Sequence, residues 1–303
     1  MKIYYTDHFE LPLPDGHRFP MDKYRRLRQH VARSEHHLQD TLIVPPAATD
    51  QQLLSCHTER YVNAVCEGTL SHSEIRRIGF PWSTQMVERS RRSTGATLAA
   101  SRAAIAGSIS VNLAGGTHHA MRDAGEGYCV FNDAAVTIRT LQRERLIQSA
   151  CVIDLDVHQG NGTAEILAND RTAFTLSLHG VKNFPIRKSP SDLDVNLDDG
   201  TTDEEYITVL CEALQQIDES GPFDLAIYLA GADPFEHDRL GRLRLTKKGL
   251  AERDRTVMQW CLDHNLPLAI TMAGGYAPDV NDIVEIHGTT VQLASMYSRL
   301  AMS

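Results

Sequence analysis

The chain has 303 residues, of which 42% are hydrophobic, and this is enough for one large α/β domain or two small ones. The formal net charge of -9 is spread over segments of mixed sign, so the chain lacks the basic stripe that nucleic-acid binding requires. The start of the sequence does not resemble a secretory signal, and no apolar stretch approaches the roughly 18 residues of a membrane span. We therefore expect a soluble globular protein that binds neither nucleic acid nor a membrane directly.

The cysteines of the sequence indicate a cellular compartment. There are six, far apart from one another: Cys56, Cys66, Cys129, Cys151, Cys211 and Cys261. They form no CxxC pair and no dense framework, which is typical of reduced thiols. A cytoplasmic protein is expected.

Six short runs rich in aliphatic and β-branched residues predict strands. They cover residues 2–5, 109–113, 150–154, 173–178, 224–229 and 268–272. Most are apolar at nearly every position, which is typical of strands covered on both faces. Helical patterns lie between them at residues 93–106 and 204–217, and Asp133 and Thr246 are expected to cap two further helices.

The alternation of strands and helices predicts βαβ units and a mainly parallel sheet. Neither an internal repeat nor a Pro/Gly/Ser-rich linker divides the sequence, so a single domain over residues 1–303 is preferred. The polar stretch 188–202 is predicted to be a surface loop. In such sheets, functional sites form where strands end at the carboxyl edge.

The segment CVIDLDVHQGNG begins as a strand and then places Asp154, Asp156 and His158 at alternate positions. Alternation puts these three side chains on one face. Asp233 directly follows another predicted strand and joins them as a candidate ligand. Neighbouring buried carboxylates repel each other and lose hydration, and a cation between them relieves both penalties.

Two carboxylates and one imidazole suit Zn(II), and also Fe(II), Co(II) or Mn(II). Such a set leaves coordination positions open, which favours a catalytic ion over a structural one. The alternative interpretation is that these polar residues merely solvate the ends of strands.

A predicted strand also precedes a Gly-Gly turn and the pair His118 and His119. At this position they are interpreted as a general base and its electrostatic partner beside a metal-bound water. Asp154 is expected to bind one ring and Asn161 the other. Polar surface residues are the alternative interpretation.

Tyr276 follows a further predicted strand in the sequence Ala-Gly-Gly-Tyr. The glycines allow the backbone to approach a site closely, and Gly275 is also a candidate substrate-binding residue. The Tyr276 hydroxyl is then a candidate donor to a developing oxyanion. A tyrosine that only packs is the alternative.

Taken together, the motifs GGTHHA, GYCVFND, DLDVHQGNG, AGADPFEHDRLG and AGGY resemble, in this order, those of the zinc-dependent histone deacetylase family. The resemblance runs from residue 17 to at least Tyr276, and HQGNG and GADxxxxDRLG are most similar to class IV members and their bacterial relatives. It implies the arginase/deacetylase α/β fold, with a mainly parallel sheet of about eight strands between helical layers.

The resemblance also implies roles for individual residues. It assigns one Zn(II) to three ligands, Asp156, His158 and Asp233. It makes His119 the general base and then acid, His118 an electrostatic partner bonded to Asp154, and Tyr276 the group that polarises the scissile carbonyl. Asn161 stands where class I proteins have Asp, and a neutral partner should keep the pKa of His119 lower.

Further positions match the family's substrate and cation sites. Gly127 would bond the incoming acyl-lysine, Tyr128 and Phe184 match the aromatic walls of its tunnel, and Leu240 stands where acetylpolyamine deacetylases carry Glu. Tyr128 departs from the commoner Phe. A monovalent-cation site, normally for potassium, matches five residues: Asp154, Asp156, His158, Ser177 and Leu178.

The implied activity is hydrolysis of Nε-acyl-lysine in peptides or proteins, and the resemblance leaves open the acyl length and whether the native metal is Zn(II) or Fe(II). Three alternatives come from other classes. They are a small-molecule amide hydrolase such as an acetylpolyamine deacetylase, a two-manganese enzyme like arginase or agmatinase, and a non-catalytic acyl-lysine binding protein.

Overall fold

All strands of the computed structural model, which describes residues 1–301, lie in one parallel sheet of eight with the order β2-β1-β3-β8-β7-β4-β5-β6. They are β1 (Lys2–Tyr4), β2 (Thr41–Ile43), β3 (Ile109–Asn112), β4 (Ala150–Asp154), β5 (Ala173–Gly180), β6 (Leu193–Leu197), β7 (Ala226–Leu229) and β8 (Leu268–Thr271). Each of the six predicted strands is present, with its ends within two residues of the prediction. The mainly parallel sheet is confirmed.

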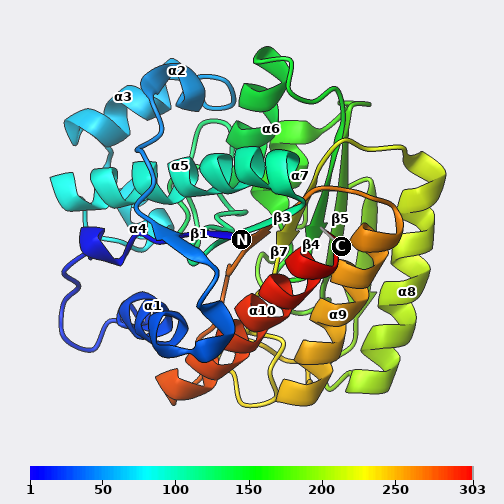
Figure 1. Ribbon diagram of the computed structural model, residues 1–303. Coiled ribbons are helices and arrows are strands. Elements are labelled where there is room, and N and C mark those ends of the chain that lie inside the picture. The colour runs from blue at the N-terminus through cyan, green and yellow to red at the C-terminus, as the bar shows by residue number, and fades with distance from the viewer. Residues whose placement is uncertain (302–303) are drawn as a thin grey trace.

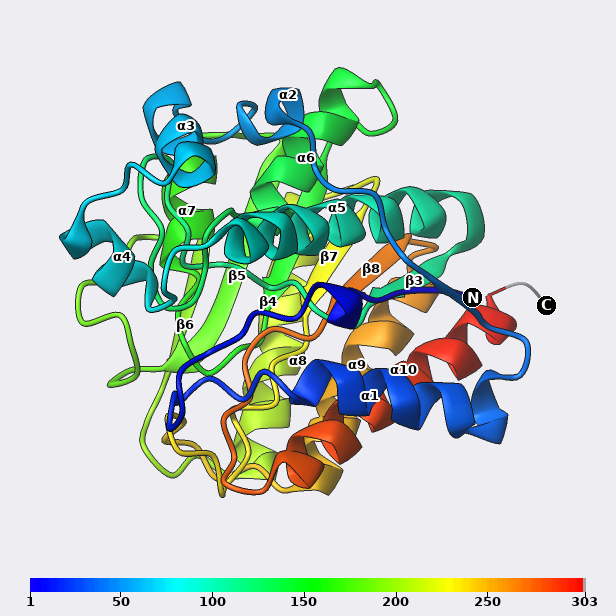
Figure 2. The same ribbon diagram turned by 90° about the vertical axis from the view of Figure 1, so that its left-hand side faces the viewer.

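Helices cover both faces of this sheet (Figure 1). They are α1 (Lys23–Arg33), α2 (Asp50–Leu53), α3 (Glu59–Glu67), α4 (His72–Ile78), α5 (Thr84–Gly107), α6 (Asp133–Arg143), α7 (Asn161–Leu167), α8 (Asp203–Ser220), α9 (Lys247–Asp263) and α10 (Val280–Leu300), with 3-10 turns at Asp7–Phe9 and Glu35–His37. Helices α1, α8, α9 and α10 form the layer on one face of the sheet, and α5 and α6 belong to the layer on the opposite face (Figure 2). Within the described residues, no helix is both long and apolar enough to cross a bilayer.

Strand β4 shows why both faces need covering. Cys151 and Ile153 pack into the core beneath α8, α9 and α10, whereas Ala150 and Val152 pack into the core beneath α5 and α6. Successive side chains of a strand point to opposite faces, so an uninterrupted apolar run fills two cores. The continuous runs in the sequence therefore correspond to central strands.

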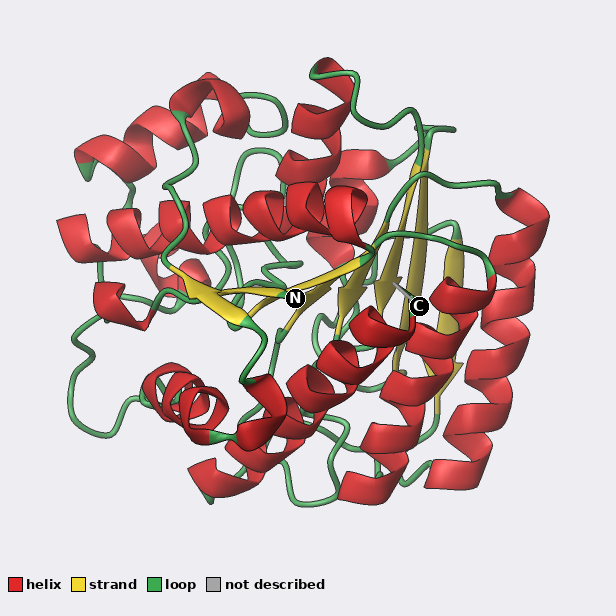
Figure 3. Cartoon of the chain, in the orientation of Figure 1, coloured by secondary structure: helices red, strands yellow, loops and turns green. Residues whose placement is uncertain are grey.

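Two details of the sequence prediction are wrong. Asn132, not Asp133, caps α6, because its amide oxygen accepts a hydrogen bond from the backbone N of Ala135 at 3.0 Å. The stretch 188–202 is not only loop, since it contains β6, which is labelled in Figure 2 and pairs with β5 at the edge of the sheet. Figure 3 shows the strands of this sheet in yellow. An edge strand needs apolar residues on one face only, and its exposed Asn196 made the segment look like a loop.

The order of the strands places the polar loops next to one another. Strands β3, β8, β7 and β4 are consecutive neighbours, and the loops that follow them carry the histidine pair, Tyr276, Asp233 and Asp156. Because all of these strands are parallel, their carboxyl ends lie at the same edge. The fold thus gathers residues that are far apart in the sequence.

Candidate metal centre and active site

Asp156, His158 and Asp233 converge as the sequence predicts. All three are buried, and one ligand atom of each lies within 4.8 Å of the others. Strand β4 ends at Asp154, yet Leu155 and Val157 continue into the core, so the alternate side chains still face the site. The alternation seen in the sequence therefore persists beyond the hydrogen-bonded strand.

The surroundings of these carboxylates fit a divalent cation. Oδ1 of Asp233 accepts a hydrogen bond from the backbone N of Val157 at 2.9 Å, whereas its buried Oδ2 accepts none and lies 3.2 Å from Nδ1 of His158. Burial and repulsion from Asp156 raise the pKa of Asp233 to about 7. A cation between the two carboxylates would remove this repulsion and satisfy the free oxygen.

The backbone holds the same carboxylates from the other side. The N–H groups of Gly274 and His158 donate to Asp156 at 2.7 and 2.9 Å. A Cβ at position 274 would lie 1.9 Å from Oδ2 of Asp233, so only glycine leaves room for this approach. The Gly-Gly sequence before Tyr276 thus has a steric cause.

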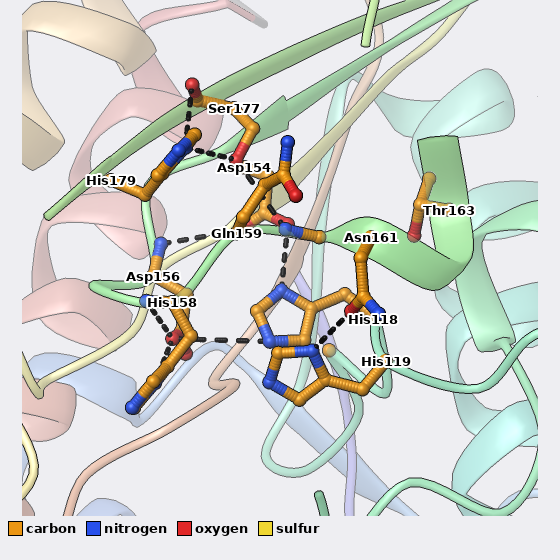
Figure 4. A network of polar contacts seen from close by, with 12 residues as sticks. His118, His119, Asp154, Asp156, His158, Gln159, Asn161, Thr163, Ser177 and His179 are labelled. Carbon is orange, nitrogen blue, oxygen red and sulfur yellow. Dashed lines mark hydrogen bonds and ion pairs between the residues drawn. The ribbon is translucent and has the colours of Figure 1, made fainter. Parts of the chain in front are cut away.

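The two histidines bind the partners predicted for them (Figure 4). Nδ1 of His118 lies 2.7 Å from Oδ2 of Asp154, and Nδ1 of His119 lies 2.6 Å from Oδ1 of Asn161. The amide oxygen of Asn161 only accepts, so Nδ1 of His119 carries the proton and Nε2 is left as an acceptor. This is the tautomer that a general base requires.

The two imidazole rings are adjacent but differ in charge. Their centroids are 4.1 Å apart. Burial opposes protonation of His118, but the carboxylates of Asp154 and Asp156 outweigh it and raise its pKa to about 9. Burial and the positive neighbours His118 and His158 lower the pKa of His119 well below its usual value. One ring is therefore charged while the other is a neutral base.

Asp133 shapes the loop that carries the histidine pair. Its carboxylate accepts hydrogen bonds from the backbone N–H groups of Gly116 and Thr117, both at 2.8 Å. Gly116 has a φ of 71°, and a Cβ there would lie 2.4 Å from the Cβ of Ala273. The turn thus requires glycine both for its backbone conformation and for its contact with the loop after β8.

Two residues that sequence reasoning missed hold the loop of Tyr276. The backbone N of Tyr276 donates to Oδ2 of Asp238 at 2.6 Å. Nζ of the buried Lys23 donates to the carbonyls of Ala273 and Gly275 at 3.3 and 3.4 Å. Asp238 belongs to the AGADPFEHDRLG motif and Lys23 lies near the start of the region that resembles the family, but a motif does not state what its members contact.

The side chain of Tyr276 lines a cavity of about 590 Å³ together with His119 and His158. Burial and the negative charges of Asp233 and Asp156 raise the pKa of Tyr276 well above its usual value. Its hydroxyl is therefore protonated and available as a donor.

The predicted substrate residues Gly127, Tyr128, Phe184 and Leu240 also line this cavity. The Phe184 ring meets the His119 ring edge-on, with centroids 4.9 Å apart. The Tyr128 ring lies 6.1 Å from that of Tyr276. These aromatic rings give the cavity apolar walls next to the histidine pair.

The two glycines predicted at the substrate site, Gly127 and Gly275, have different surroundings. A Cβ at Gly127 would lie 2.6 Å from Cδ2 of His119, so the absence of a side chain keeps the ring accessible. Gly275 is buried and does not appear among the residues that line the cavity, and its carbonyl accepts from Lys23. Its role is to shape the loop that presents Tyr276.

The predicted monovalent-cation residues lie on neighbouring strands. Ser177 is the register partner of Asp154 in the β4–β5 pair, and Leu178 follows it. Oγ of Ser177 lies 3.0 Å from Nδ1 of the buried His179 (Figure 4). Asp154 and Ser177 thus lie side by side on adjacent strands next to the proposed metal ligands.

A buried arginine on α9 contacts both loops that carry the predicted metal ligands. Nη1 of Arg253 donates to the carbonyl of Leu155 at 3.3 Å and to that of Gly231 at 2.6 Å. Nη2 donates to Asp254 at 2.8 Å, which balances the charge. Arg253 thus links the loop after β4 to the loop after β7.

The sequence matches the model of the histone deacetylase domain over residues 17–290. The chain belongs to the histone deacetylase family. Histone deacetylase 2 of Arabidopsis thaliana is 30% identical over 271 residues, which are 86% of this chain and 70% of that protein. An uncharacterised protein of Picosynechococcus sp. (strain PCC 7002) is 40% identical over 286 residues, covering 94% of this chain and 95% of the relative.

Solved structures agree with the family in fold. The crystal structure of the HDA15 HD domain has a TM-score of 0.80 at 20% identity and covers 99% of this chain and 93% of that one. That of an HDAC homologue complexed with SAHA has a TM-score of 0.79 at 23% identity and covers 99% and 83%. This family member therefore has the arginase/deacetylase fold and is a hydrolase of the histone deacetylase type.

Proposed function

We propose that the protein is a zinc-dependent deacylase that removes acyl groups from the ε-amine of lysine in peptides or proteins. The observation that carries this proposal is the convergence of three groups at the base of one cavity. These are the buried ligand set of Asp156, His158 and Asp233, the histidine pair, and Tyr276. Membership of the histone deacetylase family implies a hydrolase of this type, and the site geometry supports the removal of acyl groups from lysine.

The proposed metal is Zn(II), held by Asp156, His158 and Asp233. When bound, such an ion lowers the pKa of its water and polarises an amide carbonyl. Two carboxylates and an imidazole leave coordination positions for both.

The residues around this site divide the remaining work. Nε2 of His119 accepts a proton from the attacking water and later gives it to the departing lysine amine. His118, with its pKa of about 9, keeps its positive charge and so keeps His119 neutral. The hydroxyl of Tyr276 donates to the carbonyl oxygen as negative charge develops there. The products are a carboxylate and a free ε-amine.

The cavity walls favour an acylated lysine side chain over a polycation. Tyr128 and Phe184 present aromatic rings to a linear, uncharged chain. Leu240 lines the cavity where an acetylpolyamine deacetylase would place a carboxylate, so nothing at this position attracts a polyamine. Peptidyl acyl-lysine is therefore the proposed substrate.

We also propose a potassium ion near Asp154, Ser177 and Leu178. The register of β4 and β5 supports it, because oxygen atoms suit a hard monovalent cation. Activity should rise when potassium replaces a large organic cation in the buffer, and equal activity in both would contradict this site.

The decisive test is turnover of a panel of acetyl-, butyryl-, octanoyl- and myristoyl-lysine peptides and acetylated polyamines by purified protein. Turnover should disappear after exhaustive chelation and return with one equivalent of Zn(II) per chain. Binding without turnover would instead indicate an acyl-lysine binding protein. Faster turnover of acetylpolyamines than of every peptide would assign the small-molecule activity.

A further inference from the structure

The mouth of the active-site cavity carries positive charge. Five of its lining residues are cationic: Arg18, Arg76, Arg77, Lys182 and Arg242. Among the described residues that line the cavity, Glu126 is the one that carries a carboxylate. The whole chain has a formal net charge of -9, so the charge at this mouth is opposite to that of the molecule. We call these five cations the cationic rim.

The rim is assembled from separate parts of the fold. Arg18 precedes α1, Arg76 and Arg77 lie in the last turn of α4, Lys182 follows β5, and Arg242 follows the loop of Asp233. Cations in a last helical turn are favoured by the helix dipole, which accounts for the pair on α4. It does not account for the other three, which lie in loops.

Internal ion pairs leave most of this charge available. Arg77 pairs with Glu126 at 3.2 Å, and Lys182 and Arg242 share the single carboxylate of Asp199 at 3.3 Å each. Their side chains are 41%, 66% and 56% exposed, so solvent and ligands reach them.

Arg18 and Arg76 are less constrained still. Both are exposed, and neither side chain makes a hydrogen bond or an ion pair with any of residues 1–301. Five cations thus face two carboxylates around the opening through which a substrate must pass.

We propose that the enzyme selects acyl-lysine whose neighbouring groups carry carboxylates. This inference rests on the proposed function and names its substrate class. The acylated side chain occupies the cavity between Tyr128 and Phe184, which leaves the rest of the substrate at the cationic rim. Carboxylates placed there gain attraction from several arginines at once, whereas lysines or arginines are repelled. The carboxylates come either from acidic residues flanking acyl-lysine in a peptide or from the free carboxylate of acyl-lysine itself.

The test compares peptides of equal length that differ only in the residues flanking acyl-lysine: Glu, Gln or Lys on both sides. Each exposed charge pair is weak, but several act together at the cationic rim. We therefore expect kcat/KM to be about tenfold higher for the Glu peptide than for the Lys peptide. The difference should shrink in about 0.5 M salt, where exposed charges are screened. Free Nε-acyl-lysine and its carboxamide, assayed in parallel, tell the two sources of the carboxylate apart.

A charge-reversed variant locates the effect. Arg76→Glu removes an arginine whose side chain has no partner and should reduce the ratio of kcat/KM for the Glu peptide to that for the Lys peptide by about threefold or more. Arg171→Glu is the matched control, because Arg171 is exposed and precedes β5 at the opposite edge of the sheet. It should keep the wild-type ratio.

The outcomes separate this inference from the proposed function. Equal kcat/KM for all three peptides would overturn the inference and leave the deacylase activity intact. A complete lack of turnover would contradict the proposed function and the inference with it. Stronger inhibition by single-stranded RNA than by poly-glutamate would assign the cationic rim to nucleic acid and overturn the proposal.

Discussion

Two neighbouring histidines with different partners show how single residues set the chemistry of this site. His118 faces the carboxylate of Asp154, and His119 faces the amide of Asn161. A carboxylate stabilises an imidazolium, whereas an amide only orients the ring. The same residue type therefore has two roles within one dipeptide.

Replacing Asn161 by Asp should move the acidic limb of the pH–rate profile upward by about one unit or more. His119 must be neutral to accept a proton, so activity is lost as pH falls through its pKa, which a carboxylate raises. The measurement is kcat against pH, with the exposed Asn169→Asp as control. An unmoved limb would show that Asn161 does not govern this ionisation.

Replacing Tyr276 by Phe should lower kcat by about two to three orders of magnitude, because it removes one donor to the developing oxyanion. Zinc content should not change, since the hydroxyl is not among the proposed metal ligands. Steady-state kinetics and metal analysis check this, and Tyr5→Phe controls for loss of a distant hydroxyl. Near-normal turnover would exclude Tyr276 from the reaction.

At the scale of elements, the site depends on four adjacent strand ends and on helices that hold their loops. Lys23 on α1 binds the loop after β8, and Arg253 on α9 binds the loops after β4 and β7. These side chains act on backbone carbonyls and touch no ligand atom. They position the residues that do.

Arg253 is a positioning residue, and its replacement by Met should weaken zinc affinity by about 10- to 100-fold, as expected for outer groups of a metal site. Arg253→Lys, which keeps the charge and one donor, should restore part of this loss. Competition with a chelator measures the affinity, and Arg255→Met on the same helix is the control. Unchanged zinc affinity in a folded Arg253→Met variant would show that Arg253 contributes only to the stability of the fold.

At the scale of the whole molecule, the proposed metal site joins segments distant in sequence. The hydrogen bond between Val157 and Asp233 already spans 76 residues, and a shared ion would connect the same two loops. A ligand that binds only the folded state stabilises it by mass action. Metal binding and global stability should therefore be coupled.

Zinc should raise the Tm of the metal-free protein by roughly 5 °C at a hundredfold excess over Kd, and more at pH 8 than at pH 6. Burial and Asp156 raise the pKa of Asp233 from 3.8 to about 7, so the folded metal-free form binds a proton there that zinc must displace. This group's contribution to metal-free stability is present below about pH 4 and lost as pH rises through 7.

Thermal unfolding with and without zinc at the two pH values tests this coupling. Asp233→Asn should lose most of the zinc-dependent shift. A larger shift at pH 6 than at pH 8 would contradict the proton competition.

Sequence patterns were sufficient to predict the structure wherever it is determined by interactions between residues close together in the chain. The apolar run before Asp154 predicts a buried strand, and the alternation after it predicts which side chains face the site, because both follow from the two-residue period of extended chain. The Gly-Gly pairs are visible in the sequence too, although contacts with distant segments are what require them. The motifs for the metal ligands, the histidine pair and Tyr276 could therefore be found, and the structure brings all of them together.

Only the tertiary structure determined the contacts between distant segments. Lys23 binds a carbonyl 252 residues away, and residues 193–197 form the edge strand β6 because they pair with β5. The cationic rim is invisible in a chain with net charge -9, because its members come from loops that meet only when the sheet is assembled. Local periodicity carries no information about strand order, and strand order decides which loops become neighbours.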